Sequence, residues 1–383
     1  MSNRVDIPEK IRTRLWVLAG GHCQYEGCPE ALWRDDLTMA EMNAAFIAHI
    51  IDVNPQTHRY DPVLSKELAA DISNLMLLCY KHHRLIDHEE EREHSVARLT
   101  RMKRQHEARI ELLTSLQEDK KSHVLFYGAN IGEQNVALNW KKATQAMLPE
   151  RYPAEPRAIE LSLGNSSFED SSDNYWNIER QNLRQNLRNS LRPRIVSGDV
   201  GHLSIFAHAP QPLLIELGRL LTDIPAAEVY QLHREPPDWR WQESPQGFDF
   251  IIDEPADVCS TVALNLSFSA TIDNSRITAV LPQSDLSIWR MTVPTPHNDF
   301  LKSREQLRLF RKTFRQLLDR IKARHGQDTL LHVFPAVPVS IAVEIGRVWM
   351  PKADLPLCIY DQNRKLGGFK EVFRFTREGG RDE

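Results

Sequence analysis

Two segments in the second half of the chain carry the same residues in the same register. The run LSIFAHAP at 203–210, followed by ELGR at 216–219, matches LHVFPAVP at 331–338 and EIGR at 344–347, with every shared residue 128 positions apart. A tyrosine and an arginine follow each copy 130 positions apart, as Tyr230 and Arg234 and then as Tyr360 and Arg364. Each copy has the pattern of a strand, a helix opened by proline and a second strand. The repeat therefore predicts a pseudo-two-fold α/β domain built from two βαβ units.

The apolar pattern before the repeat outlines a smaller N-terminal domain. A helix is predicted over 8–20, strands over 46–51 and 74–78, and a charged helix from Tyr80 to about Leu116. The composition changes near residue 123, so we expect one domain at 1–122 and a second at 123–383. Between the repeat copies we expect a strand over 262–268 and a long basic helix from Ser303 to Arg324. Its basic side is interpreted as a solvated face rather than a nucleic-acid surface.

Charge and cysteine content exclude several classes of protein. Basic residues number 48 and acidic residues 52, so a polyanion is not bound by bulk charge and any nucleic-acid contact must be local. No apolar run reaches about 18 residues and the N-terminus is charged, so neither a membrane segment nor a signal peptide is expected. Five cysteines, an odd number, do not suggest a disulfide framework. We therefore expect a cytoplasmic protein with reduced thiols and no membrane partner.

Cysteine and histidine in the N-terminal domain have the spacing of a metal site. Cys23 and Cys28 form one close pair, and Cys79 and His82 form a second. Two close pairs of such ligands are what a closed tetrahedral zinc site needs. The ion would be structural, because a small domain with two short strands gains folding free energy by binding it. The alternative is that Cys23 and Cys28 are ordinary buried thiols.

Four further polar residues of this domain are not explained by zinc. His49 ends the first predicted strand, Asn74 opens the second, and His83 and Asp87 lie four residues apart on one face of the following helix. A histidine and a carboxylate at that spacing can hold a second, catalytic cation, while His49 reaches the same point from the strand. A neutral histidine near a divalent ion suits a general base in phosphodiester hydrolysis. Each histidine alone would be interpreted as an ordinary core or surface residue, and only the joint pattern indicates a site.

These residues resemble a known family. The run from Ala48-His49-Ile50 to Asn74-Leu75-Met76-Leu77-Leu78-Cys79-Tyr80-Lys81-His82-His83, with Cys23 and Cys28 upstream, resembles the HNH endonucleases and their zinc-bound variant. The resemblance implies an α+β module of the ββα-metal fold, in which His49 activates water and Asn74 pins the loop between the strands. His83 would bind Mg²⁺ or another divalent cation, with Asp87 as a candidate second ligand. One position departs from the family, which often has Asp or His as a metal ligand where this chain has Ala48.

A basic segment of the predicted N-terminal helix offers contacts to DNA. Residues 98–109, RLTRMKRQHEAR, hold five basic side chains against one acidic side chain, among them Arg101, Lys103 and Arg104. Such charges bind phosphates and position a duplex without reading its bases. Together with the resemblance to HNH endonucleases, this predicts non-specific cleavage of double-stranded DNA. The alternative is a solvated helix face.

The repeat also predicts where a small ligand binds. In open α/β sheets, ligands bind at the carboxyl ends of the strands, beside helix N-termini that favour phosphate. A pocket repeated by a two-fold axis suits a ligand with two similar halves, such as a cyclic dinucleotide. The candidate residues lie at those strand ends or offer stacking and phosphate-pairing groups, and they are Phe206, His208, Pro210, Arg234, Trp239, Trp241, Phe334, Pro335, Ala336 and Pro338. The alternative for the two tryptophans is a plug in the core.

A second resemblance covers residues 123–383. The repeated units resemble a SAVED domain, in which two CARF-like, Rossmann-like βαβ units are fused into a sensor of cyclic oligonucleotides. An HNH module joined to SAVED is similar to the effector nucleases of the antiphage system CBASS. That resemblance implies a cyclic dinucleotide activator, a homo-oligomer formed through the SAVED domain, and degradation of double-stranded DNA. Two alternatives stay open: a zinc-stabilised sensor or DNA-binding scaffold without catalytic activity, which Ala48 favours, and a modification-dependent restriction nuclease.

Overall fold

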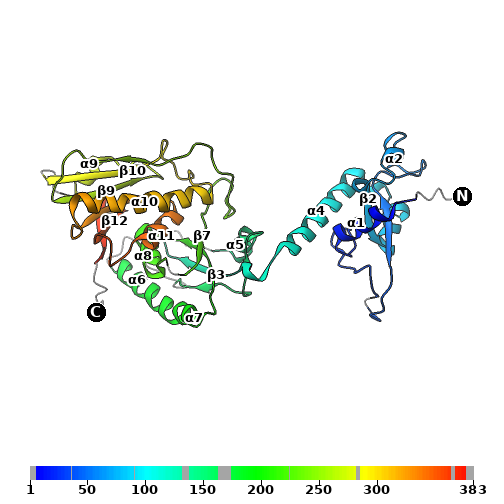
Figure 1. Cartoon of the computed structure of the whole chain (residues 1–383), viewed down its shortest axis with the longest axis horizontal. Coiled ribbons are helices and arrows are strands. Elements are labelled where there is room, and N and C mark those ends of the chain that lie inside the picture. Colours follow the sequence, from blue (N-terminus) through cyan, green and yellow to red (C-terminus); the bar gives the residue numbers. More distant parts are fainter. Residues whose placement is uncertain are drawn as a thin grey trace. The chain divides into compact units, whose positions relative to one another are not determined.

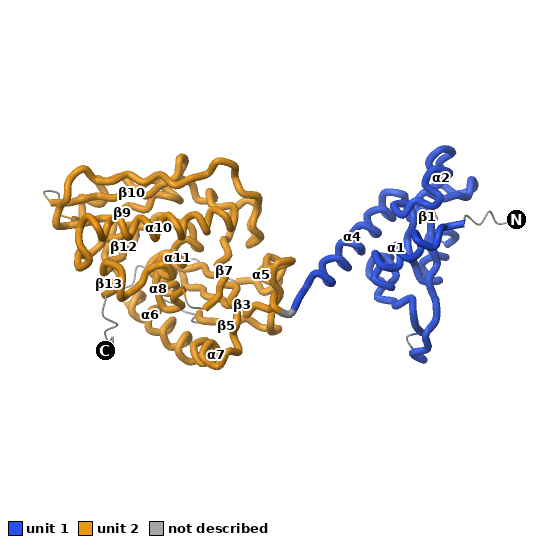
Figure 2. Tube along the Cα trace, viewed as in Figure 1, with its two compact units in different colours: residues 1–117 blue, residues 118–383 orange. Residues whose placement is uncertain are grey.

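The computed structural model describes residues 6–35, 37–89, 91–131, 138–162, 174–223, 225–281, 285–363 and 367–376. The chain divides into two compact units, 1–117 and 118–383, which are coloured separately in Figure 2. The boundary expected at 122/123 falls inside the strand β3 (Lys121–Gly128), so the structure places it a few residues earlier. Arg364, assigned to the second repeat copy, lies outside the described residues. None of the helices in the described part is both long and apolar enough to cross a membrane.

The first unit is a small α+β module built on a two-stranded sheet (Figure 1). In chain order it contains α1 (Glu9–Ala19), β1 (Ala45–His49), α2 (Leu64–Glu67), the 3₁₀ turn η1 (Ile72–Asn74), β2 (Leu75–Cys79), α3 (Tyr80–Arg84), the π turn η2 (Leu85–Glu89), the 3₁₀ turn η3 (Glu91–Glu93) and α4 (Val96–Ser115). β1 and β2 pair antiparallel, with His49 opposite Leu75 and Ala45 opposite Cys79. The buried face of this hairpin, α1 and α4 share one hydrophobic core. The two strands that the sequence suggested are therefore present.

The sequence prediction of a single helix from Tyr80 to about Leu116 is wrong. The α-helix stops after Arg84, passes through η2 and η3, and starts again as α4. The new start is set by Ser95, whose hydroxyl accepts a hydrogen bond from the backbone N–H of Arg98 at 3.3 Å. Helical spacing of apolar residues continues on both sides of the break, so periodicity alone does not reveal it.

The second unit contains two separate sheets. In chain order its elements are the 3₁₀ turn η4 (Glu118–Lys120), β3 (Lys121–Gly128), α5 (Trp140–Met147), β4 (Tyr152–Pro153), β5 (Ile159–Glu160), α6 (Tyr175–Asn186), the π turn η5 (Leu187–Leu191), α7 (Arg192–Val196), β6 (Leu203–His208), α8 (Gln211–Leu221), β7 (Ala227–Val229), β8 (Ile251–Asp253), β9 (Thr261–Ser267), α9 (Asn274–Thr278), β10 (Leu286–Thr292), α10 (Arg304–His325), β11 (Leu331–Ala336), α11 (Val339–Val348), β12 (Leu357–Asn363) and β13 (Gly368–Phe375). One sheet has the order β4-β3-β6-β7, with β5 also pairing with β3, and its strands are parallel. The other has the order β13-β12-β11-β9-β10-β8, with antiparallel strands only at its two edges. The α/β architecture expected for this half is confirmed.

The two sheets repeat the same βαβ unit. β6, α8 and β7 of the first sheet correspond to β11, α11 and β12 of the second. The ring of Phe206 stacks on that of Tyr230 with centroids 4.4 Å apart, and Phe334 stacks on Tyr360 at 4.3 Å. The residues that defined the repeat therefore play the same packing role in both copies, as a duplicated unit requires.

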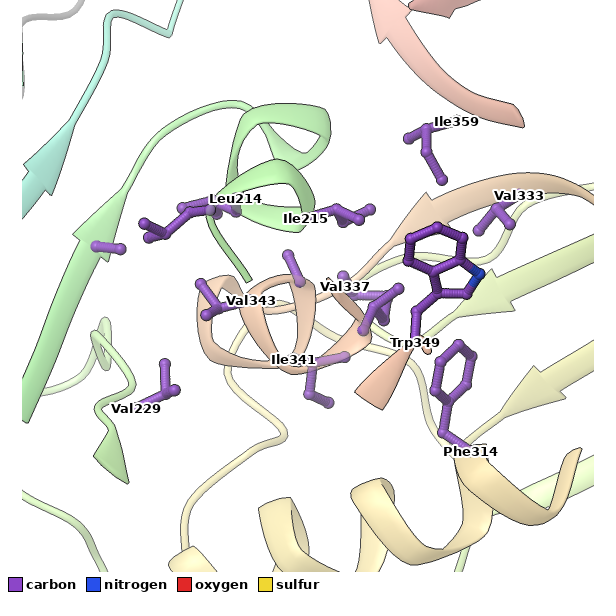
Figure 3. Close-up of a cluster of buried hydrophobic side chains, with 14 of the residues drawn as sticks. Leu214, Ile215, Val229, Phe314, Val333, Val337, Ile341, Val343, Trp349 and Ile359 are labelled. Atoms are coloured by element: carbon purple, nitrogen blue, oxygen red, sulfur yellow. The ribbon is translucent and has the colours of Figure 1, made fainter. Parts of the chain in front are cut away.

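The helices α8 and α11 pack against each other at the centre of the second unit (Figure 3). Leu214 and Ile215 of α8 share one continuous core with Ile341 and Val343 of α11. The same core includes strand residues from both sheets, such as Val229 and Val333. The paired helices thus form the shared interior of the duplicated domain, and the N-terminus of each follows a strand end.

Candidate functional site

Three thiols and one imidazole meet at one end of the small sheet. The Sγ atoms of Cys23 and Cys79 lie 3.7 and 3.2 Å from Nδ1 of His82. With Cys28, the four ligand atoms all lie within 4.8 Å of one another. A tetrahedral zinc ion with Zn–S bonds of about 2.3 Å separates its sulfur ligands by about 3.8 Å. The structure thus brings together the four predicted ligands, and their chemistry and spacing fit zinc.

Short backbone links place these ligands. β2 ends at Cys79, which is the residue preceding α3, so His82 in the first turn of that helix lies beside it. The backbone N–H of Cys79 donates to Sγ of Cys23 at 3.4 Å. The side chain of Gln24 accepts from the backbone N–H of Leu77 at 2.8 Å, which ties the turn carrying Cys23 to β2. The cluster is therefore fixed by the hairpin and by the start of the helix after it.

Burial keeps the thiols of the cluster protonated until an ion binds. Burial raises the pKa of Cys79 to about 11 and raises the pKa of Cys23 well above its ordinary value. Zinc binds thiolates, so a buried thiol pair of this kind releases protons when it binds the ion. Because the four ligands complete a tetrahedral shell, no position is left for a reacting molecule.

His49 has the protonation pattern of a base. Its Nε2 lies 2.9 Å from the carbonyl oxygen of Ala69 in the loop between the strands. A carbonyl oxygen can only accept, so Nε2 carries the ring proton and the lone pair is on Nδ1. In the neutral form of such a ring, Nδ1 carries the lone pair and can take a proton from water.

Asn74 fixes the loop that holds His49. Its Oδ1 accepts from the backbone N–H of Ile51 at 2.7 Å, and its Nδ2 donates to the carbonyl oxygens of Ile51 at 3.0 Å and Leu68 at 3.3 Å. The buried amide thus joins the end of β1 to the segment that precedes β2. Asn74 therefore acts on the backbone of this loop.

His83 and Asp87 approach each other above a buried arginine. Nε2 of His83 lies 3.5 Å from one carboxylate oxygen of Asp87, and the other accepts a hydrogen bond from Nη2 of Arg59 at 2.5 Å. Arg59 is fully buried and also lies 3.6 Å from Asp52. Burial lowers the pKa of His83, against the opposing effect of Asp87. In the described part of the chain, no third histidine, cysteine or carboxylate joins His83 and Asp87 in a metal-binding group. A cation at this place would therefore have two protein ligands.

The hairpin also shows what the departure at Ala48 means. Alternation along a strand places Ala48 on the same face of β1 as Phe46, and the ring of Phe46 lies 5.3 Å from that of His83. Ala48 therefore faces α3, but its side chain is a buried methyl group. HNH endonucleases often have a metal ligand at this position. His49 is the last residue of β1, and among the described residues its side chain contacts Ala69 and not His83.

The predicted DNA contacts on α4 divide into exposed and buried residues. Arg101 and Arg104 are exposed. Lys103 is buried, and its Nζ donates to Glu107 at 2.5 Å, so the expectation that Lys103 contacts DNA is wrong. Its helical position puts it on the stripe that includes Leu99, which faces the core.

The basic side chains of α10 are largely paired within the second unit. These ion pairs join Arg304 to Glu228 and Glu150, Arg311 to Glu344, Arg315 to Asp354, and Arg320 and Arg324 to Glu254. Carboxylates that occupy the guanidinium groups compete with phosphates for them. This arrangement favours a protein surface over a nucleic-acid interface, in line with the interpretation from the sequence.

Several residues expected to contact a ligand belong to the core instead. Phe206, Trp239 and Phe334 are buried in hydrophobic clusters, so the expectation that they stack on a ligand is wrong. The ring of Trp239 packs edge-on against Phe206 at 5.2 Å, which is the core plug considered as the alternative. The three prolines among the candidates are also buried, at the starts of α8 and α11 and inside β11, and they are Pro210, Pro338 and Pro335.

Trp241 is partly buried, with its ring 6.4 Å from that of Tyr230 and 6.0 Å from that of His233. The remaining candidates lie at the carboxyl ends of the parallel strands or follow them. His208 ends β6, and burial, with a smaller effect of the Arg234 charge, lowers its pKa and keeps it neutral at pH 7. Ala336 ends β11. The side chain of Gln211, the first residue of α8, accepts from the backbone N–H of Val337 at 3.2 Å. This bond brings together the N-termini of the two repeated helices.

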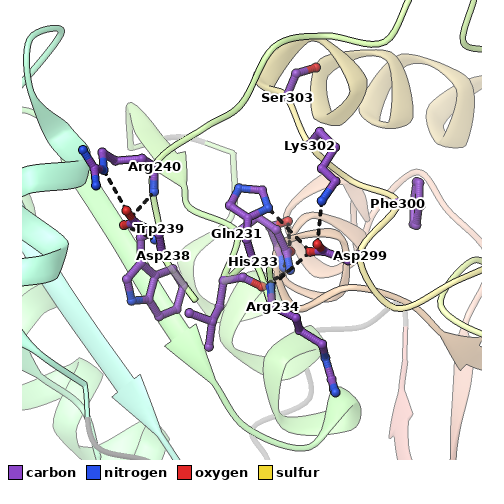
Figure 4. A network of polar contacts seen from close by, with 12 residues as sticks. Gln231, His233, Arg234, Asp238, Trp239, Arg240, Asp299, Phe300, Lys302 and Ser303 are labelled. Carbon is purple, nitrogen blue, oxygen red and sulfur yellow. Dashed lines mark hydrogen bonds and ion pairs between the residues drawn. The ribbon is translucent and has the colours of Figure 1, made fainter. Parts of the chain in front are cut away.

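A polar network ties the loop after β7 to the second repeat copy (Figure 4). Oε1 of Gln231 accepts from the backbone N–H and the hydroxyl of Ser340 in α11, at 3.2 and 2.8 Å. Asp299 accepts from the backbone N–H of Arg234 at 3.2 Å and from Nζ of Lys302 at 2.5 Å. The guanidinium of Arg234 is exposed and points away from this network. Isolated polar residues in loops have no periodicity, so sequence analysis missed Gln231 and Asp299.

Two sheets with parallel central strands, joined by a central pair of related helices, define a duplicated Rossmann-like α/β domain. A family model named SAVED, described as the SMODS-associated and fused to various effectors sensor domain, matches residues 183–375, just over half of the chain. The chain belongs to the SAVED family. No curated protein sequence matches it.

Solved structures of low sequence identity are also similar to the chain. The Acinetobacter baumannii Cap4 SAVED/CARF-domain containing receptor, solved with the cyclic trinucleotide 2'3'3'-cAAA, is 13% identical with a TM-score of 0.43. The match covers 73% of this chain and 62% of that one. The corresponding Moraxella osloensis receptor is 14% identical with a TM-score of 0.38, over 74% of this chain and 61% of that one. The chain thus spans less than two thirds of the length of either receptor.

Proposed function

We propose that this protein is a metal-dependent DNA endonuclease of the HNH type, gated by a cyclic oligonucleotide that binds its SAVED unit. The observation that carries the proposal is the arrangement of the first unit. A hairpin and the helix after it hold a four-ligand cluster suited to zinc, a histidine whose Nε2 is bonded to a loop carbonyl, and a His83–Asp87 pair. Zinc would stabilise the module, and the other residues would perform hydrolysis.

The residues have separate roles in that reaction. His49 accepts a proton at Nδ1 from water while the water oxygen bonds to phosphorus, and the bond from phosphorus to the leaving sugar oxygen breaks. The leaving oxygen takes a proton from solvent. A divalent cation such as Mg²⁺, bound by His83 and Asp87, would offset negative charge on the phosphate and the leaving group. Asn74 orients His49 through the loop, and Arg59 holds Asp87 toward His83.

Binding at the SAVED unit would control when this chemistry occurs. The family is described as a sensor domain fused to various effectors. The N-termini of α8 and α11 meet through Gln211 and Val337, so a ligand with repeated halves would meet equivalent groups from both copies. Oligomerisation through this unit would then gather nuclease units on double-stranded DNA. A gated, non-specific nuclease of this kind suits an antiphage effector of the CBASS type.

The proposal is tested by incubating the purified full chain with plasmid DNA. Each reaction contains Mg²⁺ or Mn²⁺ and one member of a panel of cyclic dinucleotides and cyclic trinucleotides. We expect nicked and then fragmented plasmid only when both a nucleotide and a cation are present, with a larger assembly in light scattering. Full cleavage without nucleotide would contradict gating. Cleavage without nucleotide that depends on DNA methylation would support the modification-dependent alternative.

A matched pair of histidine variants tests the catalytic assignment. His49→Ala should abolish cleavage and leave the metal content and the melting temperature of the first unit close to those of the parent. His88→Ala, which removes an exposed histidine of the same unit, should cleave at the parental rate. If the parent never cleaves, or if His49→Ala cleaves normally, the catalytically inactive scaffold favoured by Ala48 is the better explanation.

A further inference from the structure

A small cavity lies in the second unit between the edge strand β7 and the start of α10. Its volume is about 210 Å³, and all three residues of β7 line it. The charged groups in its wall come from four elements or loops, and they are Arg151, Arg304, Arg308, Arg311, Glu228 and Glu344. Glu344 is part of α11 in the second repeat copy, while Glu228 is part of β7 in the first. Both copies therefore contribute to one cavity.

This cavity is separate from the carboxyl ends of the strands. His202, which also lines it, directly precedes β6, whereas His208 ends that strand. Six steps along an extended strand cover about 20 Å at ~3.3 Å per residue. The cavity is thus at the amino ends, at the opposite edge of the sheet from His208, although Trp241, one of the residues expected to contact a cyclic oligonucleotide, also lines it.

The charges in the wall do not cancel. Arg304 forms an ion pair with Glu228, and Nε of Arg311 lies 3.3 Å from Glu344, which the buried Arg347 of α11 shares at 3.0 Å. Arg151 instead donates to the backbone carbonyl of Asp119 at 3.1 Å. Arg151 and Arg308 are thus the two arginines of the wall that do not form an ion pair with Glu228 or Glu344.

Two further carboxylates lie outside the wall and have to be weighed. Glu305 is 4.0 Å from Arg308, and Glu150 is 3.2 Å from Arg304. Their side chains are 63% and 53% exposed, so water and salt screen their charges strongly. The side chain of Arg308 is itself 75% exposed, so its charge is screened as well. Arg151 and the second arginine that shares Glu344 leave a surplus of positive charge at the cavity.

We propose that this cavity binds a phosphate-bearing anion, either inorganic or the terminal phosphate of a nucleotide. A phosphomonoester carries a charge of about −1.5 to −2 near pH 7, which matches the surplus. Guanidinium groups present forked N–H donors whose geometry fits phosphate oxygens. The first two turns of α10, a helix of 22 residues, line the cavity and add the favourable field of a helix N-terminus. A volume below the ~300 Å³ typical of drug-sized ligands selects a compact anion.

Titration calorimetry of the full chain with separate anions tests this site. The probes are inorganic phosphate, pyrophosphate, 5′-AMP and adenosine. We expect pyrophosphate and 5′-AMP to bind and adenosine not to bind, because the phosphate provides the recognition. Tighter binding of pyrophosphate would identify an inorganic ligand, and tighter binding of 5′-AMP a nucleotide terminus. Binding of adenosine as tight as that of 5′-AMP, or no binding of any probe at millimolar concentration, would overturn the proposal.

Charge-matched variants locate the bound anion. Arg308→Gln and Arg151→Gln should each weaken binding about tenfold, since a hydrogen bond to a charged group is worth ~1.5 kcal/mol or more. Lys312→Gln removes the same charge from an exposed position of α10 outside the wall and should change the affinity less than about twofold. His208→Ala tests the carboxyl edge and should have no effect. Loss of binding in His208→Ala with parental binding in Arg308→Gln would move the anion to that edge and refute the proposal.

Discussion

Gly218 of α8 and Gly346 of α11 lie where the two repeated helices touch backbone to backbone. A Cβ atom at Gly218 would lie 1.9 Å from the carbonyl oxygen of Val343, and one at Gly346 would lie 2.0 Å from that of Ile215. The two glycines are 128 residues apart, at the same place in each repeat copy. Both copies therefore have glycine at this position, because any residue with a Cβ atom would prevent the two helices from packing this closely.

Gly218→Ala and Gly346→Ala should each destabilise the second unit severely. The clash is with backbone, which no side-chain rotation relieves, so we expect a loss of at least about 3 kcal/mol in the free energy of unfolding. Urea denaturation followed by tryptophan fluorescence measures the change. Gly201→Ala is the control, because a Cβ there has no heavy atom within 4 Å and should be neutral or slightly stabilising. A loss below 1 kcal/mol in both helix variants would mean that the helices separate more easily than this packing implies.

Removing zinc should unfold the first unit and leave the second folded. We expect about one zinc ion per chain by elemental analysis, since the cluster offers three thiols and one imidazole. Cys79→Ser should not bind the ion, and its first unit should already be unfolded at low temperature, because metal binding supplies folding free energy to a small core. The thermal unfolding transition of the first unit should therefore be missing in this variant. Cys259→Ser, at a partly exposed cysteine outside the cluster, should keep both. Metal-free protein with unchanged melting would contradict a structural role.

Arg59→Met should destabilise the first unit by about 1–3 kcal/mol. The change leaves Asp87 and Asp52 without their buried partner, but both carboxylates keep some contact with water, which limits the loss. Denaturation of Arg59→Met, Asp87→Asn and the double variant measures the coupling. The double variant should lose less than the sum of the single losses. Arg104→Met, at an exposed position of α4, should stay within about 0.5 kcal/mol of the parent. Strict additivity would show that the pair does not interact.

The features that sequence analysis found are those that recur at fixed spacing. The repeat was visible because Phe206 and Phe334 must each stack on a tyrosine, and because Gly218 and Gly346 must each lack a side chain. The ligand cluster was visible because a tetrahedral ion needs four donors of few types. In both cases one physical requirement limits the residue types allowed at several positions at once, so the sequence alone reveals it.

The features that sequence analysis missed depend on contacts between single residues. Arg59 bonds Asp87, which lies 28 positions later in the chain, beyond β2 and α3, and nothing in the local pattern marks this pair. Lys103 is in a basic segment of the sequence, but it lies on the face of α4 that packs against the core. There its charge is neutralised by Glu107. Trp239 has the type expected of a stacking platform, yet the nearest apolar surface is Phe206 of its own core. Residue type alone does not tell which of two apolar partners a side chain meets.

His202 should make the second unit lose stability as the pH falls from about 6.5 to about 4. Burial, followed by the charges of Arg151 and Arg347, lowers its pKa from 6.5 to about 4 in the folded chain. Between these values the unfolded chain binds the proton and the folded chain does not, so acid favours unfolding. The contribution is therefore fully present above pH 6.5 and lost below pH 4.

A comparison of variants isolates this group from the other histidines that titrate in the same range. His202→Asn keeps a hydrogen-bonding atom near Ser122, which bonds Nδ1 of the parent at 2.8 Å, and removes the titration. The unfolding free energy of the parent should fall more steeply between pH 6.5 and 4, by at most about 1.4 kcal/mol per pH unit for a single proton. Urea denaturation at half-unit intervals measures the difference between the two slopes. Parallel curves would mean that His202 is solvated enough in the folded unit to keep its ordinary pKa.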